Sequence, residues 1–317
     1  MLSDSNHNMN GGEAKIEIFK PFGEAFDLMK KILFQPFDFT KWLVIGFAAF
    51  LCGHFSVGGF NFPFGGFPQN QRNPKLISPY WDQWKPWLPI AIIVFVVVVL
   101  VLIVVLSWLR ARGNFIFTDC IVRNRAAIAE PWREFRKEGN SYFLFLLALL
   151  IASMALFGLF LLPVWLCLQF FSQDAGSHLI VILFAVVGVL LVLAWICFAF
   201  FFGLTSYFMV PVMYIRRCRA LDAFRDVLKL IVDNIGSFVL FCLFGFCLLL
   251  GMLMIGGIAT CLTCCLAALP YVGTVILLPV FVCLRAFGLC FIRQFGSEYD
   301  VWAALPPPAA ELPPLPS

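Results

Sequence analysis

Long apolar runs constrain the fold of this sequence more than any other feature. The longest is almost unbroken from residue 238 to residue 291. It is more than twice the length needed to cross a bilayer, because about 20 apolar residues span a hydrocarbon core of about 30 Å. It must therefore fold back once, and the Gly, Thr, Cys and Pro residues between Gly256 and Gly273 mark the expected turn. With 62% hydrophobic and only 13% charged residues, the composition excludes a water-soluble domain.

These runs predict an all-α, polytopic membrane helix bundle with about six spans. The expected spans are residues 39–55, 87–109, 142–171 and 179–210, and two more within residues 238–291. The run that ends near Tyr214 is too long for one upright helix, but dividing it would invert the topology of everything after it. We therefore expect one long, tilted or kinked helix there, with Gly203 and Pro211 as bend points.

The distribution of basic residues predicts the orientation of the six spans. All but three of the 22 Lys and Arg fall on one side of the membrane, and the exceptions are Arg72, Lys75 and Lys85. Because basic residues concentrate on the cytoplasmic side of membrane proteins, we expect both termini there. The first apolar run begins near residue 39, too far from Met1 for a secretory signal peptide, so the first span is expected to be retained.

The expected organisation has three parts. They are a cytoplasmic segment with an amphipathic helix (1–38), the six-span membrane domain (39–295) and a Pro-rich tail (296–317). The expected loops of the membrane domain are an outer loop (57–86) and two basic cytoplasmic loops (110–141 and 211–237). The tail has the composition of a solvated polyproline II or unstructured segment, and a recognition ligand is the alternative.

Two of the cytoplasmic segments have the periodicity of amphipathic helices. The expected apolar faces are Phe22, Phe26, Met29 and Leu33 in the first, and Leu221, Phe224, Leu228, Ile231 and Ile235 in the second. Each helix is expected to lie in the membrane interface just before a span. The two segments resemble each other, and a weaker third copy surrounds Trp132. Either a unit of one interfacial helix and a helical hairpin occurs three times, or amphipathic helices have converged.

The stretch from Tyr207 to Phe244 carries a family resemblance. A span ends in Val210-Pro211, a basic turn follows, and an amphipathic helix with Ala223-Phe224 leads into the next span. This pattern resembles the membrane domain associated with bacterial glycerophosphoryl diester phosphodiesterases, and related multi-pass families of unknown function. The resemblance covers about a third of the chain and implies a helix bundle in the bacterial cytoplasmic (inner) membrane. It does not imply the hydrolase activity, because no soluble stretch is long enough for the catalytic barrel.

Few residues in the expected spans have side chains suited to chemistry. Ionisable groups within a bilayer are functional candidates because they are costly there, and the candidates in the expected spans are His54 and Arg285. The lack of acidic residues in the span cores argues against proton-coupled transport and aspartyl proteolysis. Cys261, Cys264 and Cys265 lack the further ligands of a zinc site, so we expect them to be structural, and a periplasmic thiol pair is the alternative. Nucleophile and phosphate-loop motifs are missing, and we expect no catalytic, cofactor or metal site.

Basic residues beside the spans are the candidate binding residues. The candidate contacts for anionic lipid are Arg123, Arg125, Arg216, Arg217, Arg219 and Arg285. Near an anionic leaflet each arginine contributes about 1 kcal/mol, although a topogenic role alone also explains the loop arginines. Arg285 lies about two turns before Arg293 and is expected to snorkel toward the cytoplasmic end of its span. The alternative is a buried cation that pairs with an anionic lipid or a substrate carboxylate.

Two functions of different classes are compatible with these features. The first is a non-enzymatic scaffold or accessory protein that organises lipids or partner proteins through its interfacial helices and basic loops. The second is a transporter or flippase-like carrier of an apolar or amphiphilic substrate. Membrane lipids, including anionic ones, are the expected partners, and the sequence leaves a protein partner open. The basic residues form separate short clusters, which argues against a nucleic-acid partner.

Overall fold

The computed structural model describes residues 17–53, 87–173, 178–263 and 269–303. Within these ranges the regular elements are helices and there is no β-strand, so the predicted all-α class is confirmed. Several predictions fall outside the described residues. These concern the outer loop, His54, Cys264, Cys265 and the tail from residue 304 onward.

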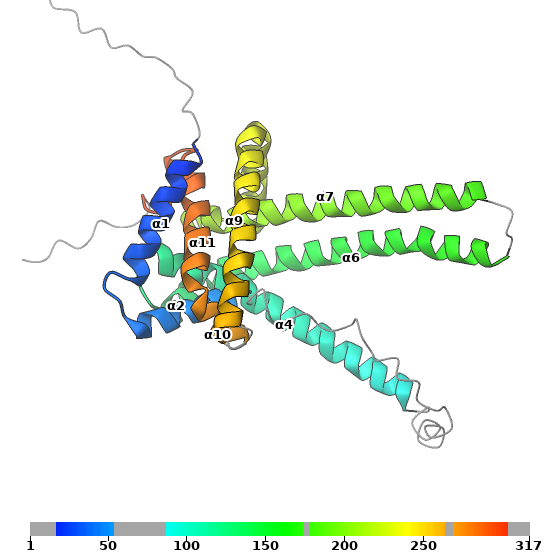
Figure 1. Ribbon diagram of the computed structural model, residues 1–317, viewed down its shortest axis with the longest axis horizontal. Coiled ribbons are helices and arrows are strands. Elements are labelled where there is room, and N and C mark those ends of the chain that lie inside the picture. Colours follow the sequence, from blue (N-terminus) through cyan, green and yellow to red (C-terminus); the bar gives the residue numbers. More distant parts are fainter. Residues whose placement is uncertain (1–16, 54–86, 174–177, 264–268, 304–317) are drawn as a thin grey trace, which may run out of the picture.

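Long apolar helices fan out from a compact body (Figure 1). In chain order the elements are α1 (Phe19–Leu33), α2 (Phe39–Leu51), α4 (Leu88–Val122), α5 (Ala129–Glu134), α6 (Arg136–Gln173), α7 (His178–Arg216), α8 (Ala220–Asp233), α9 (Ile235–Leu262), α10 (Pro270–Ile276), α11 (Leu278–Arg293) and the 3-10 helix η2 (Ser297–Tyr299). Helices α4, α6, α7 and α9 are the long ones, and the body contains α1, α2, α10, α11 and one end of each long helix. Glu17 and Gln294 exchange two hydrogen bonds of 3.0 and 2.9 Å, so the two ends of the described chain lie together on the body.

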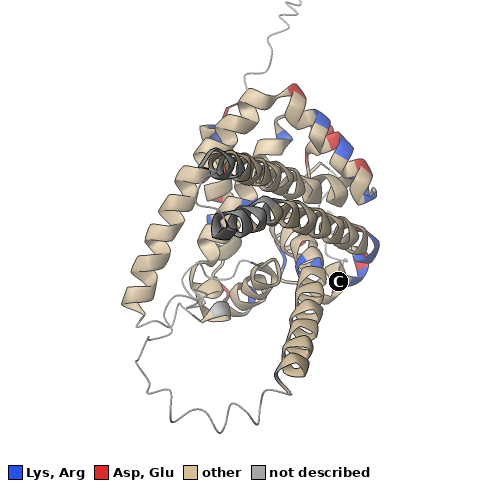
Figure 2. Cartoon of the chain, turned by 90° about the vertical axis from the view of Figure 1, so that its right-hand side faces the viewer, with Lys and Arg blue, Asp and Glu red and all other residues tan. Residues whose placement is uncertain are grey.

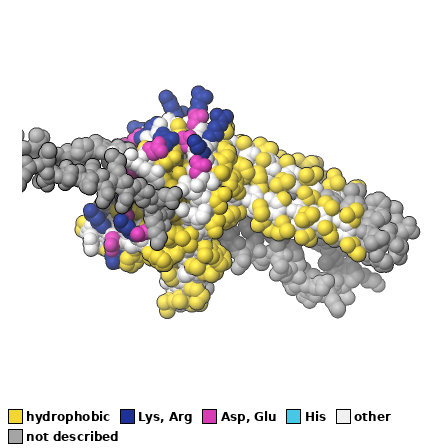
Figure 3. All heavy atoms as spheres, turned by 90° about the horizontal axis from the view of Figure 1, so that it is seen from above, with side chains coloured by type: hydrophobic (Ala, Val, Ile, Leu, Met, Phe, Trp, Pro, Cys, Tyr) yellow, Lys and Arg dark blue, Asp and Glu magenta, His cyan; other side chains and the backbone are white. Residues whose placement is uncertain are grey.

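Within the described residues, four helices are long and apolar enough to cross a membrane. They are α4, α6, α7 and α9. Most of the large apolar side chains on these helices are exposed, and Phe95 of α4 is 68% exposed. Charged side chains instead gather on the body (Figure 2), while the helices that project from it have a hydrophobic surface (Figure 3). This separation matches a bilayer around the long helices and water around the charged part of the body.

Two expectations about the longest apolar runs are confirmed. The run from residue 179 to residue 214 folds as the single helix α7, which continues through Pro211 to Arg216. The run from residue 238 to residue 291 folds back once. Helix α9 ends at Leu262 and α10 begins at Pro270, within the turn predicted between Gly256 and Gly273.

Two expected spans differ from the prediction. The first, predicted over residues 39–55, is the 13-residue helix α2, which ends at Leu51. At 1.5 Å per residue it is only about 20 Å long, shorter than a bilayer core. The last expected span is divided at Leu277 into α10 and α11, because Pro279 cannot donate a backbone hydrogen bond. Most of α11 is buried in the body, and a count of six spans stays a prediction.

Both segments that were expected to be basic cytoplasmic loops are largely helical, and their place on the cytoplasmic side stays a prediction. In the segment 110–141, α4 continues to Val122, α5 follows, and α6 begins at Arg136. Hydropathy falls at Arg110, but Thr118 and Asp119 on this part of α4 are fully buried and hydrogen-bonded to other residues of the body. The segment 211–237 likewise holds the end of α7, the whole of α8 and the start of α9.

Helices α1 and α8 cover the segments in which amphipathic helices were expected, but the faces they bury in the body differ from the predicted apolar stripes. Helix α1 packs on α11, and α8 packs on α7. Both helices bury corresponding positions, which are Ala25, Met29 and Leu33 in α1 and Ala223, Val227 and Ile231 in α8. Phe26 and Leu221, which were expected on the apolar faces that lie in the membrane interface, are 42% and 62% exposed. Small alanines turn toward the neighbouring helix instead, because they allow the two backbones to approach closely.

Candidate functional site

A cavity of about 410 Å³ lies between α4, α6 and α7, beside α11. Its polar lining consists of Ser107, Arg110 and Asn114 from α4, Tyr142 and Ser153 from α6, Ser206 and Tyr207 from α7, and Arg285 from α11. Apolar residues such as Leu146 and Phe202 complete the wall. Two arginines and no carboxylate are present among the described residues that line it, so the cavity has an excess of positive charge.

Arg285 is the most deeply buried cation of this cavity, at 5% exposure. Its Nε and Nη2 atoms donate to the hydroxyl oxygen of Thr118 at 3.2 and 2.8 Å, and that hydroxyl donates to the carbonyl oxygen of Asn114 at 2.8 Å. The guanidinium carbon lies 5.2 Å from the centre of the Tyr207 ring. The expected snorkelling toward Arg293 is therefore wrong, because the side chain turns into the body. No described carboxylate forms an ion pair with it.

Arg110 is the second arginine of the cavity and lies one turn of α4 before Asn114. Its side chain crosses the end of α2, where a Cβ on Gly53 would come within 3.2 Å of Arg110 Cδ. Gly53 also has a φ of +81°, a conformation that other residues rarely adopt. The backbone at Gly53 thus leaves the space in which the arginine stem lies, and the Arg110 guanidinium reaches the cavity wall.

Two tyrosines of the wall are already engaged in hydrogen bonds. The Tyr142 hydroxyl donates to the carbonyl oxygen of Ser206 at 3.1 Å, and the Tyr207 hydroxyl donates to that of Leu284 at 3.0 Å. These bonds join α6 to α7 and α7 to α11, so they hold the cavity walls together. The arginines are left as the charged groups that a ligand would meet.

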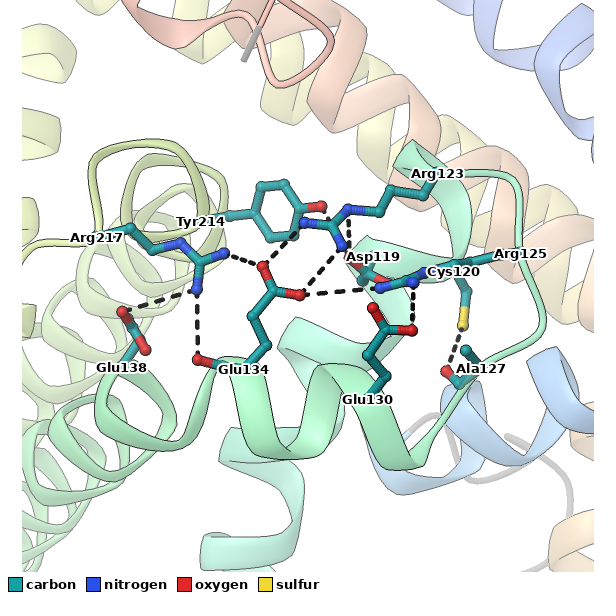
Figure 4. Close-up of polar contacts among 10 residues, drawn as sticks. All are labelled: Asp119, Cys120, Arg123, Arg125, Ala127, Glu130, Glu134, Glu138, Tyr214 and Arg217. Carbon is teal, nitrogen blue, oxygen red and sulfur yellow. Dashed lines mark hydrogen bonds and ion pairs between the residues drawn. The ribbon is translucent and has the colours of Figure 1, made fainter. Parts of the chain in front are cut away.

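A second polar cluster surrounds Asp119 at the body end of α4 (Figure 4). The Asp119 side chain is completely buried and accepts hydrogen bonds of 2.9 Å from both Arg125 and the Tyr214 hydroxyl. Arg123 Nε lies 3.2 Å from the same carboxylate, and its two terminal nitrogens donate to Glu134 at 3.1 and 2.9 Å. This cluster fixes the turn after α4 against α5 and α7.

The remaining candidate arginines are placed differently from one another. Arg217 pairs with Glu134 and so joins the Asp119 cluster, whereas Arg216 pairs with Asp226 at 2.6 Å and Glu298 at 2.8 Å. Arg219 is exposed and has no ion-pair partner among the described residues. Of the six predicted lipid contacts, the structure brings Arg123, Arg125 and Arg217 together and places Arg285 in the cavity.

Three ion pairs occupy similar positions in the fold, and we call them the corner ion pairs. They are Arg123 with Glu134, Arg216 with Asp226, and Arg293 with Glu24. Each joins the end of a helix to the amphipathic segment that packs on it. Asn124 and Arg217 follow the first two arginines, and both have a φ of 50°. The similarity agrees with a repeated unit, and a true triplication stays a prediction.

Glu134 gives the Asp119 cluster a dependence on pH. Partial burial acts to raise the pKa of this carboxyl, but hydrogen bonds from Arg123 and Arg217 outweigh that effect and hold the pKa below its ordinary value of 4.5. A lowered pKa in the folded state stabilises the fold at any pH above the ordinary value. That contribution is lost as the pH falls through the lowered pKa.

We therefore expect the stability difference between the wild type and Glu134→Gln to depend on pH. The wild type should unfold at the higher temperature near neutral pH, and the difference should shrink as the pH falls well below 4.5. Thermal unfolding in detergent micelles, followed by circular dichroism over this pH range, measures the difference. An unchanged difference at the lowest pH would show that the ionised form of Glu134 is not stabilising.

Sequence reasoning identified Arg285 but missed the α4 side of the cavity. Arg110 was counted only as a topogenic charge, and neither Asn114 nor Thr118 was singled out. A signal was available, because these three residues lie at positions i, i+4 and i+8 and so share one face of a helix. Cys261 is exposed on α9, and among the described residues no group of three His, Cys, Asp or Glu is placed to hold a metal ion.

Comparison with known proteins gives a family but no function. One family model, described as "Family of unknown function (DUF7544)", matches residues 17–299. That range covers the chain from α1 to η2, including both the cavity and the corner ion pairs. No curated protein and no solved structure matches the chain. The resemblance to phosphodiesterase-associated membrane domains stays a prediction. Because the match covers most of the sequence, the chain belongs to the family of unknown function DUF7544.

Proposed function

We propose that this chain is a non-enzymatic integral membrane protein that binds the headgroup of an anionic lipid in the cavity between α4, α6 and α7. By holding such a lipid, it organises lipids around its helices as a scaffold. The observation that carries the proposal is Arg285, a buried cation that donates to Thr118 and has no ion-paired carboxylate among the described residues.

Electrostatics supports an anionic ligand at this place. A buried cation is unfavourable unless an anion or several hydrogen bonds compensate it, and one threonine hydroxyl with the face of Tyr207 is modest compensation for a guanidinium. Lipid phosphate oxygens accept strong charge-assisted hydrogen bonds from arginine. A phosphate between Arg285 and Arg110 would therefore supply the missing negative charge.

The position of the cavity supports a lipid as the source of that anion. Leu150, which lines the cavity, is 39% exposed on the apolar surface of α6. A volume of about 410 Å³ falls within the range of about 300–1,000 Å³ that is usual for small-ligand sites. A lipid headgroup could thus enter from the membrane side without crossing the body.

The charge distribution supports one orientation of the protein in the membrane. We place the charged body at the cytoplasmic leaflet, with six crossings and both termini in the cytoplasm, because nearly all Lys and Arg then follow the positive-inside rule. Anionic lipids give the cytoplasmic leaflet a negative surface potential. In this orientation, helices α1 and α8 lie near the headgroups that the cavity would recruit.

Removing the buried cation is the direct test. We expect Arg285→Met to weaken binding of phosphatidylglycerol by about tenfold or more, because hydrogen bonds to charged groups contribute about 1.5–3 kcal/mol and 1.4 kcal/mol corresponds to a factor of ten. The measurement is native mass spectrometry of protein taken from nanodiscs of phosphatidylcholine with a minority of phosphatidylglycerol. The number of retained phosphatidylglycerol molecules is counted for each variant.

Arg133→Met is the matched control, because it removes the same charge from an exposed position on α5. It should leave phosphatidylglycerol retention within about twofold of the wild type, well inside 1.4 kcal/mol. Equal losses in both variants would reduce the effect to general charge attraction. Arg110→Gln changes an exposed side chain and supplies a second test should Arg285→Met fold poorly.

A separate assay on the same protein tests the alternative function, a lipid carrier. Liposomes that contain the protein and a labelled phosphatidylglycerol report movement between leaflets. Movement well above that in empty liposomes, and abolished by Arg285→Met, would replace the scaffold with a carrier. Retention of lipid without movement agrees with the scaffold.

A further inference from the structure

A second, smaller cavity adjoins the cationic one on the other side of Arg110. It has a volume of about 260 Å³ and lies between α2 and α4, and we call it the α2–α4 groove. Its wall is formed by Phe50, Leu51, Gly53, Ile103, Leu106 and Leu109, together with Ser107 and Arg110. Apart from Ser107 and Arg110, the described residues of this wall have no polar side chain.

The two cavities share their polar residues. Ser107 and Arg110 line both the cationic cavity and the α2–α4 groove. They are three positions apart on α4, so they lie on the same face of the helix. A ligand held at Arg110 would therefore meet charge in one direction and an apolar wall in the other.

The groove is open to the membrane along one side. Ile103 and Leu106 are 41% and 51% exposed, and they continue the row of exposed apolar residues on α4 that includes Phe95 and Val101. Helix α2 ends at Leu51, so it covers only a short length of α4. A flexible apolar chain in the groove would cover the exposed sides of these residues and continue along α4 into the bilayer.

We propose that the bound ligand is an anionic phospholipid whose phosphate lies between Arg110 and Arg285 and whose acyl chain occupies the α2–α4 groove. This inference rests on the proposed function and adds the class of the ligand and the position of its tail. A free phosphate would fill only the cationic cavity and leave the groove unused. A cation or a basic peptide is disfavoured because the described lining of both cavities contains arginine and no carboxylate.

Photo-crosslinking of the unmodified full chain tests where the tail lies. The probes are phosphatidylglycerol and phosphatidylcholine, each with a diazirine in one acyl chain, added to nanodiscs of unlabelled phosphatidylcholine. We expect phosphatidylglycerol adducts to concentrate on Phe50, Ile103 and Leu106. Phosphatidylcholine adducts should instead spread over exposed positions of α4, such as Phe95 and Val101. Identical adduct maps for the two probes would overturn the proposal.

Filling the groove supplies a second measurement. Leu106→Trp adds bulk inside the α2–α4 groove, whereas Val101→Trp adds the same residue at an exposed position five residues away, about 140° around the helix. We expect Leu106→Trp to reduce phosphatidylglycerol retention severalfold and to abolish the adducts on Ile103. Val101→Trp should change neither. If both tryptophan variants retain lipid like the wild type, the tail does not lie in the groove.

These outcomes separate the two proposals. Retention that depends on Arg285 but not on Leu106, with no adducts in the groove, would refute the tail position and leave the headgroup site standing. Retention that is unchanged by Arg285→Met and Arg110→Gln would refute the headgroup site, whatever the adducts show.

Discussion

Replacing Asp119 by alanine is expected to lower the free energy of unfolding by about 3 kcal/mol or more. The Asp119 carboxylate is completely buried and is shared by Arg125, Arg123 and the Tyr214 hydroxyl. Without this carboxylate, the two guanidinium groups would face each other with no negative charge between them. The buried Tyr214 hydroxyl would lose its hydrogen-bond acceptor. Groups left unpaired in this way cost more than the original interaction contributes, because their desolvation is no longer compensated.

The measurement is unfolding by sodium dodecyl sulfate in mixed micelles, followed by circular dichroism. Glu130→Ala is the matched control, because it removes another carboxylate that pairs with Arg125, but one that is 66% exposed. Exposed ion pairs contribute about 0–1 kcal/mol, so the control should change little. Similar losses in the free energy of unfolding for Asp119→Ala and Glu130→Ala would show that burial does not increase the contribution of Asp119 to stability.

The second large effect is expected at Gly113, near the start of the buried part of α4. A Cβ at this position would lie 2.6 Å from the backbone carbon of Leu51 and 2.8 Å from its carbonyl oxygen. Backbone atoms cannot rotate away as a side chain can, so α2 and α4 must separate to admit one methyl group. We expect Gly113→Ala to destabilise the protein by about 1–3 kcal/mol, the usual penalty of overpacking.

Gly251→Ala is the control for the glycine substitution. This residue lies in α9, and no atom lies within 4 Å of a Cβ built there. Because alanine favours helices by about 1 kcal/mol over glycine, the control should be neutral or stabilising. The same unfolding assay compares the two variants. If Gly113→Ala is as stable as the wild type, α2 does not pack on α4 as closely as described.

Residue patterns within a single helix were sufficient to predict much of the architecture. The basic residues after the apolar run predicted α7 as one helix, and the cluster of Gly, Cys and Pro residues predicted the turn between α9 and α10. Interactions between distant segments were not predictable in this way. Helix α4 continues beyond Arg110 because Asp119 bonds to Tyr214, 95 positions away, and Thr118 bonds to Arg285, 167 positions away.

The same difference between local patterns and distant contacts applies to the candidate site. Arg285 could be identified from the sequence because it is an ionisable residue within an apolar run. Its burial could not be predicted, since that depends on the contacts α11 makes in the body. Arg123 and Arg217 were predicted as lipid contacts because they lie beside spans, yet both pair with Glu134, a residue from a segment that was expected to be a loop. A basic residue near a span therefore identifies a lipid contact poorly until its acidic neighbours are known.

The pairing of Glu24 with Arg293 joins the first described helix to the last described α-helix, so it can form only late in synthesis. The two residues are 269 positions apart, and at about 5–20 residues per second the ribosome needs roughly 13–54 s to synthesise that length. Helix α1 is thus finished long before its partner α11 exists. Until α11 is made, the face of α1 that packs on α11 lacks its partner, and we expect the nascent helix to rest on the membrane surface. Arg293 can pair with Glu24 only after α11 has been synthesised.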